Sequence, residues 1–378
     1  MSLTGPLFLG GIIVVTLAAF VGVVILWPRL TPGTPWRLAG RVGALALVNV
    51  LVVLVAATQL NASFLFFASW GDLQGALTGH LVQTSVHRGG ADAQAPNIKV
   101  RGHVASVAAT VPALPKVGSS GLLTYTVHGA LSGLTGTVLV QLPPGYTSAA
   151  ASADRYPVIE AFHGYPSNPL NLVKIFHLGQ AVAARAQAHE LHPSIVVMPQ
   201  IEIPKGVDTE GVNGGPGQPQ IDTWLTRDVP EWVGQNFRVI ANRNAWATFG
   251  YSAGGFVAAM ATTLHPAQYG AGIVMGGYFR PQFGPFYEPF TSTSPMGRYY
   301  DLASAVTHRP PPVSLWVETS HADPLSYKSS ATFLHSVKAP TAVHAVILQN
   351  AGHRDSVWIS LLPDALRWLG KNVQGFRP

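Results

Sequence analysis

The segment from Ala245 to Met260 reads AWATFGYSAGGFVAAM and joins three patterns that together decide the fold. Its first five residues suit a short buried strand, and the residues from Phe256 onward suit a buried helix. Between them lies Gly250-Tyr251-Ser252-Ala253-Gly254, a G-x-S-x-G turn. In this context the turn is typical of a nucleophile elbow, where small neighbours let a strained serine project above the edge of a sheet. We therefore expect Ser252 to be a catalytic nucleophile.

Working outward from this turn, short apolar segments alternate with helical patterns through the last two thirds of the chain. We expect strands at 122–127, 137–142, 158–162, 194–198, 245–249, 313–317 and 343–348. We expect helices at 172–189, 256–264 and 357–372, with Pro363 causing a kink or a later start in the last one. Such alternation predicts an α/β fold, a mostly parallel sheet covered by helices on both faces. Residues 121–378 are expected to form this catalytic domain.

A serine hydroxyl needs a base to remove its proton, and that base needs an acid to orient it. His353 lies in the loop between the last strand and the last helix, and the order nucleophile, acid, histidine is the one that elbow-containing sheets use. Asp323 follows the strand at 313–317, and Glu318 at the end of that strand is the alternative acid. The Asp-Pro-Leu turn favours Asp323.

Two backbone N–H groups are expected to stabilise the oxyanion that forms when a serine attacks a carbonyl. The first belongs to Ala253, the residue after the nucleophile. The second is assigned to Tyr165, because the strand at 158–162 breaks at His163-Gly164-Tyr165-Pro166. His163 is expected to order this loop, and it is also a candidate substrate contact together with Tyr251.

The segment from Tyr278 to Tyr300 is rich in phenylalanine and proline and has no helical period. It is either a lid or acyl-binding wall, or an ordinary packed excursion of the chain. The first possibility makes Phe279, Phe283 and Phe286 candidate substrate contacts.

Two apolar runs lie near the N-terminus, Leu7–Trp27 and Val42–Leu60. Each is long enough to cross a hydrocarbon layer of roughly 30 Å as a helix. A cleaved signal peptide is disfavoured because no basic region precedes the first run, which is also too long for a signal sequence. We expect two transmembrane helices and an interfacial or re-entrant segment at 61–70, for which a third, partial helix is the alternative. Residues 71–120 are expected to form an extended linker that can include a strand or two.

The charges around these runs predict their orientation. Arg29, Arg37 and Arg41 all lie in or beside the loop between the runs, and residues 1–71 contain no acidic residue. Since cytoplasmic loops collect arginine and lysine, this loop is expected inside the cell. The chain is then a multi-pass protein of the cell membrane, in contact with membrane lipid, and its catalytic domain is extracytoplasmic.

Composition excludes several other classes of function. The chain of 378 residues has no cysteine, which removes thiolate nucleophiles, disulfides and cysteine-ligated metals. Of its net charge of +6, three units come from the membrane region, and no basic cluster stands out in the rest. We therefore expect no nucleic acid partner.

Taken together, the chain resembles the esterase D-like branch of the α/β-hydrolases, which includes the mycobacterial mycolyltransferases. The resemblance covers about residues 120–372, and the N-terminal runs are similar to those of membrane-anchored actinobacterial members. The matching pieces are Val138–Tyr146, His163–Pro166, Thr223–Pro230, the elbow Gly250–Gly255, the Asp323 and His353 loops, Asn61-Ala62-Ser63-Phe64 and Trp70-Gly71-Asp72-Leu73.

The resemblance implies hydrolysis of a carboxylic ester through a seryl-acyl intermediate, without metal or cofactor. The substrate is an ester or acyl donor, which can be linked to a lipid or a glycan. One alternative is a cell-envelope acyltransferase that passes the acyl group to a sugar or another alcohol. A second alternative is an envelope scaffold that kept the fold and lost turnover.

Overall fold

The computed structural model describes residues 3–30, 33–64, 66–78, 81–90, 100–102, 104–112 and 121–378. Its contacts divide the chain into two units, each described by itself. The N-terminal unit contains Met1–Val82 and Gln349–Arg354, and the sheet unit contains Gln83–Leu348 and Asp355–Pro378.

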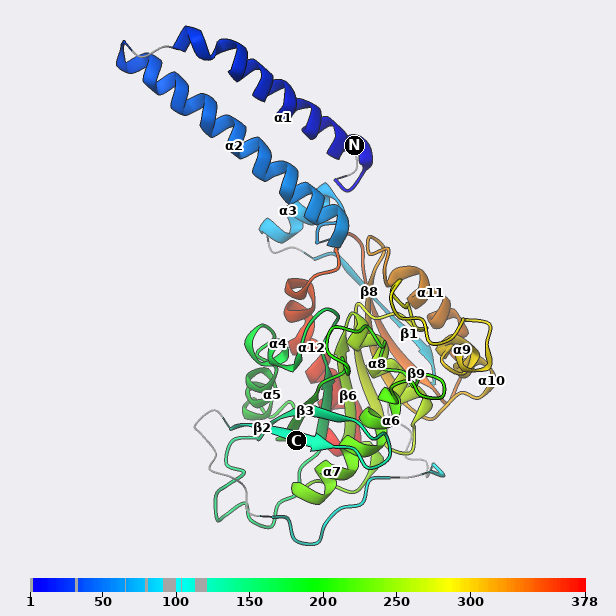
Figure 1. The fold of residues 1–378 in the computed structure, drawn as a ribbon. Coiled ribbons are helices and arrows are strands. Elements are labelled where there is room, and N and C mark those ends of the chain that lie inside the picture. Colours follow the sequence, from blue (N-terminus) through cyan, green and yellow to red (C-terminus); the bar gives the residue numbers. More distant parts are fainter. Residues whose placement is uncertain are drawn as a thin grey trace. The chain divides into compact units, whose positions relative to one another are not determined.

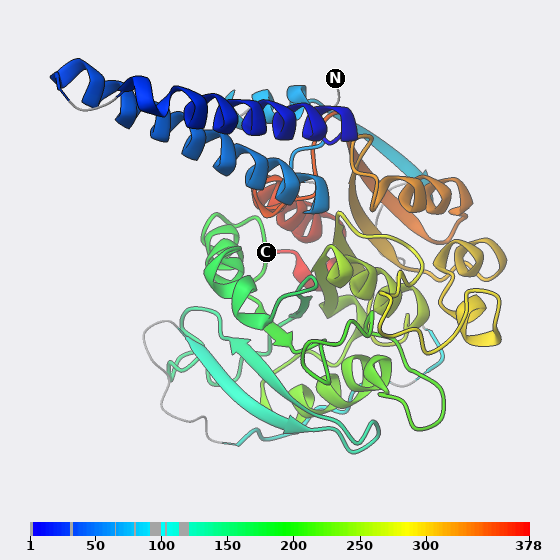
Figure 2. The same cartoon turned by 45° about the horizontal axis from the view of Figure 1, so that its top comes forward.

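The N-terminal unit is built on α1 (Pro6–Leu26) and α2 (Pro35–Phe64), which pack side by side as a hairpin (Figure 1, Figure 2). The short helix η1 (Trp27–Leu30) follows α1, and α3 (Trp70–Thr78) follows α2. Both long helices have the length and composition to cross a membrane, and no part of their apolar stretches is buried. Exposed apolar surface of this extent marks a surface that meets lipid or another protein.

The sheet unit contains a nine-stranded sheet in the order β1-β9-β8-β7-β6-β4-β5-β3-β2. Six strands form a parallel block in the order β5-β4-β6-β7-β8-β9. The remaining pairs, β1 with β9, β3 with β5 and β2 with β3, are antiparallel. Every residue of β4 to β8 is buried, as parallel strands covered on both faces require. The strands are β1 (Gln83–Gly89), β2 (Leu122–His128), β3 (Thr135–Gln141), β4 (Val158–Phe162), β5 (Ile195–Pro199), β6 (Trp246–Tyr251), β7 (Ala271–Met275), β8 (Ser314–Ser320) and β9 (Ala342–Leu348).

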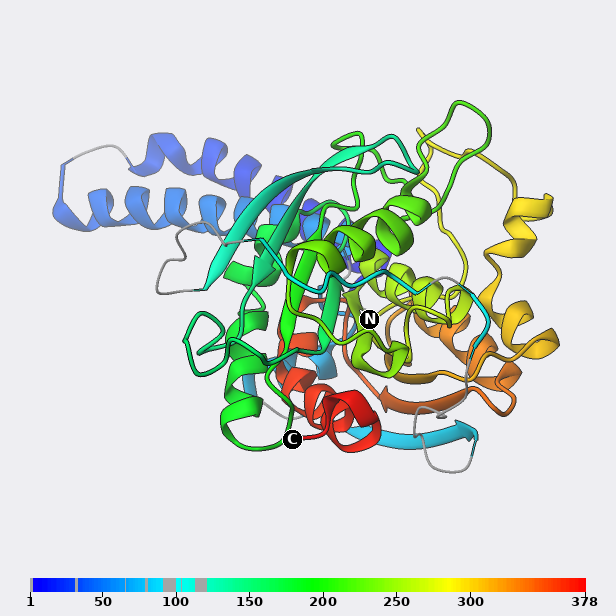
Figure 3. The ribbon, with the colours of Figure 1, turned by 90° about the horizontal axis from the view of Figure 1, so that it is seen from below.

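Helices cover both faces of this sheet, as predicted. Figure 3 shows α5 and α12 on one face and α7 and α8 on the other. The α-helices of this unit are α4 (Pro169–Lys174), α5 (Leu178–Gln187), α6 (Ile221–Thr223), α7 (Val229–Asn236), α8 (Ala253–Leu264), α9 (Pro295–Tyr299), α10 (Leu302–His308), α11 (Tyr327–Ser336) and α12 (Asp355–Asn372).

Two predicted helices differ in detail from the observed ones. The helix expected at 172–189 is broken into α4 and α5 at His177, whose φ of 48° lies in the left-handed region and interrupts helical hydrogen bonding. The last helix neither stops nor restarts at Pro363. It begins at Asp355 and continues through the proline to Asn372.

One strand of the sheet lies within the segment 71–120. Residues 83–89 form β1, which pairs antiparallel with β9 from Gln83↔Leu348 to Gly89↔Ala342. Further along, the Ala105 N–H donates to Gln268 Oε1 at 2.8 Å, and the Ala108 N–H donates to the Gly234 carbonyl at 3.0 Å. The described parts of 83–112 therefore belong to the sheet unit. Residues 79–80, 91–99, 103 and 113–120 of the expected linker lie outside the described residues.

Candidate active site

Ser252 lies between the end of β6 and the start of α8. Its φ of 56° and ψ of −126° are strained for a residue with a side chain, and its N–H donates to the Met275 carbonyl at 2.9 Å. This is the backbone geometry that the sequence predicts for an elbow serine.

The glycines around Ser252 are required by close packing. A Cβ atom added at Gly250 would collide with the Gly254 carbonyl oxygen, and one added at Gly254 would collide with the carbonyl oxygens of Phe162 and His163. Since neither position has room for a side chain, the G-x-S-x-G pattern is a steric requirement of this turn.

The two expected oxyanion donors lie beside the elbow. Ala253 is the first residue of α8, and an N–H in the first turn of a helix has no acceptor within that helix. On the other side, a Cβ added at Gly164 would lie 3.2 Å from Ser252 Cβ. The backbone therefore passes the nucleophile immediately before Tyr165.

His163 is held inside this loop by hydrogen bonds at both ring nitrogens. Its side chain is completely buried. Nδ1 lies 2.8 Å from the Gly164 carbonyl, to which it must donate, and Nε2 lies 3.3 Å from the Ile201 N–H, from which it accepts. Burial lowers the pKa of His163 to about 4, so the ring is neutral. With both nitrogens engaged, His163 has no polar atom to offer a ligand, which corrects the expectation that it does.

The two candidate acids have different surroundings. Glu318, on β8, accepts from the Gly276 N–H at 2.8 Å and from the Trp358 side chain. Burial, with Asp323 nearby, raises the pKa of Glu318 to about 8. Its carboxyl group is thus mostly protonated at neutral pH.

Asp323 lies in the loop after β8 and is 3% exposed. Its Oδ2 accepts from the Ser326 hydroxyl at 2.6 Å, and its Oδ1 accepts from the Leu325 N–H at 3.0 Å. The Asp323 N–H donates to the Ser320 carbonyl, which closes the turn. These two hydrogen bonds fix the direction of the carboxylate.

His353 lies on the six-residue loop Gln349–Arg354, which continues the chain from β9 to α12. The contacts of this loop group it with the N-terminal unit. The structure therefore brings Ser252, Ala253, Tyr165, Glu318 and Asp323 together in the sheet unit and assigns His353 to the other unit.

Two of the remaining candidate substrate contacts, Tyr251 and Phe279, are buried and pack against other aromatic rings. The Tyr251 ring is 5% exposed and stacks on Phe176 with a centroid distance of 4.3 Å. The Phe279 ring is 1% exposed and stacks on Phe333 at 3.8 Å. The burial of Tyr251 corrects the expectation that it contacts substrate, whereas Phe279 also lines a cavity and stays a candidate contact.

The segment from Tyr278 to Tyr300 therefore divides into two parts. Its ends are buried, with the Tyr278 hydroxyl donating to Glu210 Oε1 at 2.6 Å and the Tyr300 hydroxyl donating to Asp222 Oδ2 at 3.0 Å. In its middle, Phe283 is partly buried and Phe286 is fully exposed. The ends fit a packed excursion, and only the middle keeps surface that could act as a lid or a wall.

A cavity of about 610 Å³ lies beside this segment. Pro324 and Leu325, which follow Asp323, form part of its lining. Its other lining residues include the charged or polar side chains Arg280, Gln282, Asp301, Ser304, His308, Lys328 and Ser329. The lining is therefore mixed, because Phe279, Ala303, Pro324 and Leu325 add apolar surface to these polar groups.

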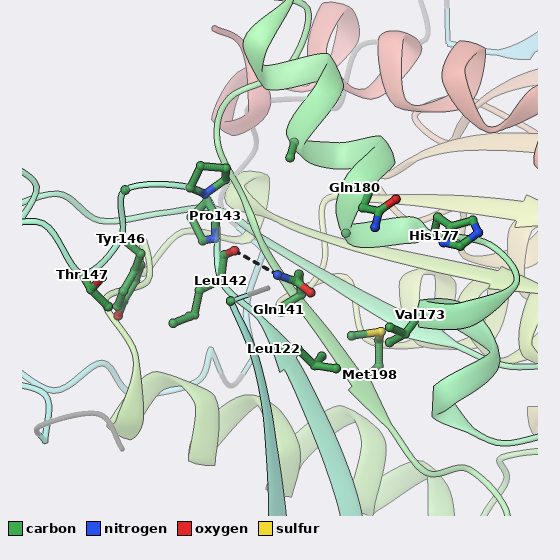
Figure 4. Close-up of a pocket in the computed structure, with 15 residues that line it drawn as sticks. Leu122, Gln141, Leu142, Pro143, Tyr146, Thr147, Val173, His177, Gln180 and Met198 are labelled. Atoms are coloured by element: carbon green, nitrogen blue, oxygen red, sulfur yellow. Dashed lines mark hydrogen bonds between the residues drawn. The ribbon is translucent and has the colours of Figure 1, made fainter. Parts of the chain in front are cut away.

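A second cavity, of about 570 Å³, lies between the end of β3 and α5 (Figure 4). Figure 4 shows Gln141, Gln180 and Met198 around it, and none of the predicted catalytic residues lines it. Gln141 pairs with Val196 near the amino end of β5, whereas Ser252 follows the carboxyl end of β6. Gln141 and Ser252 therefore lie toward opposite ends of the parallel strands.

Comparison with known proteins gives one family. The Esterase family model, described as "Putative esterase", matches residues 133–369. No curated protein matches the chain.

Several solved structures share the fold at low sequence identity. A ferulic acid esterase superposes with a TM-score of 0.57 at 18% identity, covering 67% of this chain and 98% of that one. An S-formylglutathione hydrolase from Agrobacterium tumefaciens gives a TM-score of 0.56 at 17% identity, covering 68% and 97%. Mycobacterium tuberculosis MPT51 (FbpC1) gives 0.52 at 15% identity, covering 68% and 99%. The predicted α/β-hydrolase fold is confirmed.

Proposed function

Because the chain belongs to the Esterase family and is a serine hydrolase, we propose that it is a membrane-anchored esterase that cleaves a carboxylic ester through a seryl-acyl intermediate. The esterase D-like resemblance found in the sequence agrees with this family. The observation that carries the proposal is the strained backbone of Ser252 between β6 and α8.

In the first half of the reaction, His353 accepts the hydroxyl proton as Ser252 Oγ attacks the ester carbonyl carbon. The carbonyl π pair moves to oxygen, and the resulting oxyanion accepts hydrogen bonds from the N–H groups of Ala253 and Tyr165. When the tetrahedral intermediate collapses, the bond to the alcohol oxygen breaks, and the proton on His353 goes to the leaving alcohol. An acyl group then remains on Ser252.

In the second half, His353 takes a proton from water, and the hydroxyl attacks the acyl carbon. Collapse breaks the bond between Ser252 Oγ and the acyl carbon, the proton on His353 goes to Ser252 Oγ, and the carboxylic acid is released. Asp323 holds the tautomer of His353 and stabilises its cationic form. The buried hydrogen bonds of Asp323 and the raised pKa of Glu318 support Asp323 over Glu318 in this role.

An alcohol in place of water at the second step gives acyl transfer, the alternative expected from the sequence. The ester can belong to a small molecule or can be linked to a glycan or a lipid, and the cavity beside the segment 278–300 has both polar and apolar lining residues. A series of p-nitrophenyl esters with increasing acyl length, assayed with and without a sugar acceptor, separates these substrates. Product that rises with acceptor concentration indicates transfer.

The proposal is tested with a fluorophosphonate probe on the full chain in detergent. The probe is expected to label the wild-type protein, and Ser252→Ala is expected to lose both labelling and at least about 1,000-fold of kcat, since the nucleophile is indispensable. The exposed Ser148→Ala variant is the matched control and should behave as wild type. A folded wild-type protein that takes no label and shows no turnover would support the scaffold alternative instead. A Ser252→Ala variant with full turnover would mean that Ser252 is not the nucleophile.

A further inference from the structure

The loop that carries His353 is held by the N-terminal unit. The Gln349 N–H at its start donates to the Val82 carbonyl at 3.0 Å. A Cβ added at Gly71, on α3, would lie 4.0 Å from Asn350 Nδ2. The loop therefore contacts the chain that follows the apolar hairpin, although both of its ends continue into the sheet unit.

The strongest of these contacts is made by Arg354, the residue after His353. Its Nη1 donates to Asp72 Oδ2 and to the Phe66 carbonyl, both at 2.8 Å. Its guanidinium lies over the Phe67 ring, 4.9 Å from the centroid. The side chains of Arg354 and Asp72 are only 9% and 1% exposed, so this is a buried ion pair.

Asp72 is itself fixed by the membrane-proximal segment. Its Oδ2 also accepts from the Ala68 N–H at 2.9 Å, and its own N–H donates to Ser69 Oγ at 3.1 Å. Asn61, near the end of α2, bonds both the carbonyl and the N–H of Phe67, at 3.0 and 2.7 Å. Hydrogen bonds thus connect α2 to Phe67, the next residue Ala68 to Asp72, and Asp72 to Arg354.

Burying two charges is an inefficient way to stabilise a protein, because each ion loses several kcal/mol of solvation. An arginine does constrain orientation, because its planar guanidinium holds hydrogen-bond partners at fixed angles as well as fixed distances. Here the constrained residue is Arg354, which directly follows His353 in the chain. The ion pair therefore fits a loop whose backbone must keep one orientation.

We propose that Arg354 and Asp72 are positioning residues that hold His353 in the orientation for proton transfer, so that the membrane-proximal segment 61–72 controls turnover. This inference rests on the proposed function, in which His353 is the general base. It assigns to the N-terminal segment a role in catalysis in addition to anchoring.

The test measures kcat and KM for p-nitrophenyl acetate with the full chain in detergent. Arg354→Ala and Asp72→Asn are expected to lower kcat by about 10- to 100-fold, because a misplacement of about 1 Å in a catalytic group costs rates of this order. KM should stay within about twofold, since the substrate pocket is untouched. Arg354→Lys keeps the charge without the fork and should recover part of the lost kcat.

Arg243→Lys is the matched control. Arg243 is also buried, at 6% exposure, and its Nη2 donates to the Pro312 carbonyl at 2.7 Å within the sheet unit. The Arg243→Lys variant should have a lower thermal unfolding midpoint but should not show the selective fall in kcat. If Arg354→Ala does not fold, Asp72→Asn and Arg354→Lys, which preserve side-chain volume, carry the test.

The outcomes separate this inference from the proposed function. If Ser252→Ala and His353→Ala are inactive while Asp72→Asn and Arg354→Lys keep wild-type kcat and KM, the positioning role is wrong and the esterase proposal stands. If His353→Ala keeps full turnover, the proposed function fails first.

Discussion

At Ser252 the backbone is held in a conformation that costs about 1–3 kcal/mol for a residue with a side chain. The cost is sustained because the Ser252 N–H is bonded to Met275 and the flanking glycines leave no other path for the chain. Residue identity therefore matters most at this turn and at the carboxyl groups of Glu318 on β8 and Asp323 in the loop after it.

The carboxyl groups of Glu318 and Asp323 give a prediction for two variants. Asp323→Asn should lower kcat by about 100- to 10,000-fold, because an amide stabilises the wrong imidazole tautomer. Glu318→Gln should keep kcat within a few-fold of wild type, since the wild-type carboxyl is already mostly neutral at pH 7. Kinetics on p-nitrophenyl acetate at pH 7 check this. A larger loss in Glu318→Gln than in Asp323→Asn would reverse the assignment.

Glu318→Gln has a second expected effect, on stability. The folded pKa of about 8 lies above the unfolded value of 4.5, so the folded state keeps a proton that the unfolded state releases. Stability due to this group is therefore lost as pH rises from 4.5 to 8, by up to about 1.4 kcal/mol per unit. Glu160 and Glu210, with pKa raised to about 8, act in the same direction, and His163 acts oppositely only below pH 6.5. Urea midpoints measured between pH 6.5 and 8 should fall less steeply in Glu318→Gln.

At the scale of elements, apolar patterning predicted most of the strands to within two residues. It missed β7, where Ala271-Gly272 weakens the apolar signal, and β1, whose sequence QTSVHRG is exposed at six of its seven positions. An edge strand with exposed side chains has no apolar run to detect, and its pairing with β9 is a contact across more than 250 residues.

The candidate site was predictable to a similar degree. The elbow is local, so Ser252, Ala253 and its glycines could be found from a short stretch of sequence. The pair Arg354 and Asp72 could not, since its members are 282 positions apart and neither belongs to a periodic pattern. The burial of His163, Tyr251 and Phe279 likewise depends on tertiary neighbours that a motif does not specify.

The elbow as an element gives another prediction. Gly250→Ala should prevent correct packing of β6 against α8, because the added methyl group has no space beside the Gly254 carbonyl. We expect a loss of stability of at least about 3 kcal/mol, or no folded protein. Gly215→Ala is the control, since a Cβ there meets nothing within 4 Å. Thermal unfolding of both variants checks this, and a Gly250→Ala protein with a wild-type midpoint contradicts it.

On the scale of the whole molecule, the chain separates an apolar helical hairpin from a sheet unit with an ordinary polar surface. The hairpin exposes its leucine, valine and isoleucine side chains along its length, and its arginines lie at or near the turn. This distribution favours membrane insertion with the turn in the cytoplasm and the sheet unit outside.

The absence of cysteine makes that topology directly measurable, because any introduced thiol is the only one. Gly33→Cys places a thiol in the turn of the hairpin, and Ala150→Cys places one on the exposed surface of the sheet unit. A membrane-impermeant maleimide is expected to label Ala150→Cys in intact cells and Gly33→Cys only after lysis. The reverse pattern would mean that the orientation is inverted, and labelling of both would mean that the hairpin does not span.

The seven-residue ladder between β1 and β9 also bears on how a water-soluble fragment should be designed. Without β1, the backbone amides and carbonyls of β9 would form an open border at which identical molecules could associate and precipitate. A trimmed version intended for crystallisation should consequently begin no later than Gln83, and an earlier start near Asn61 would also retain the partners of Arg354.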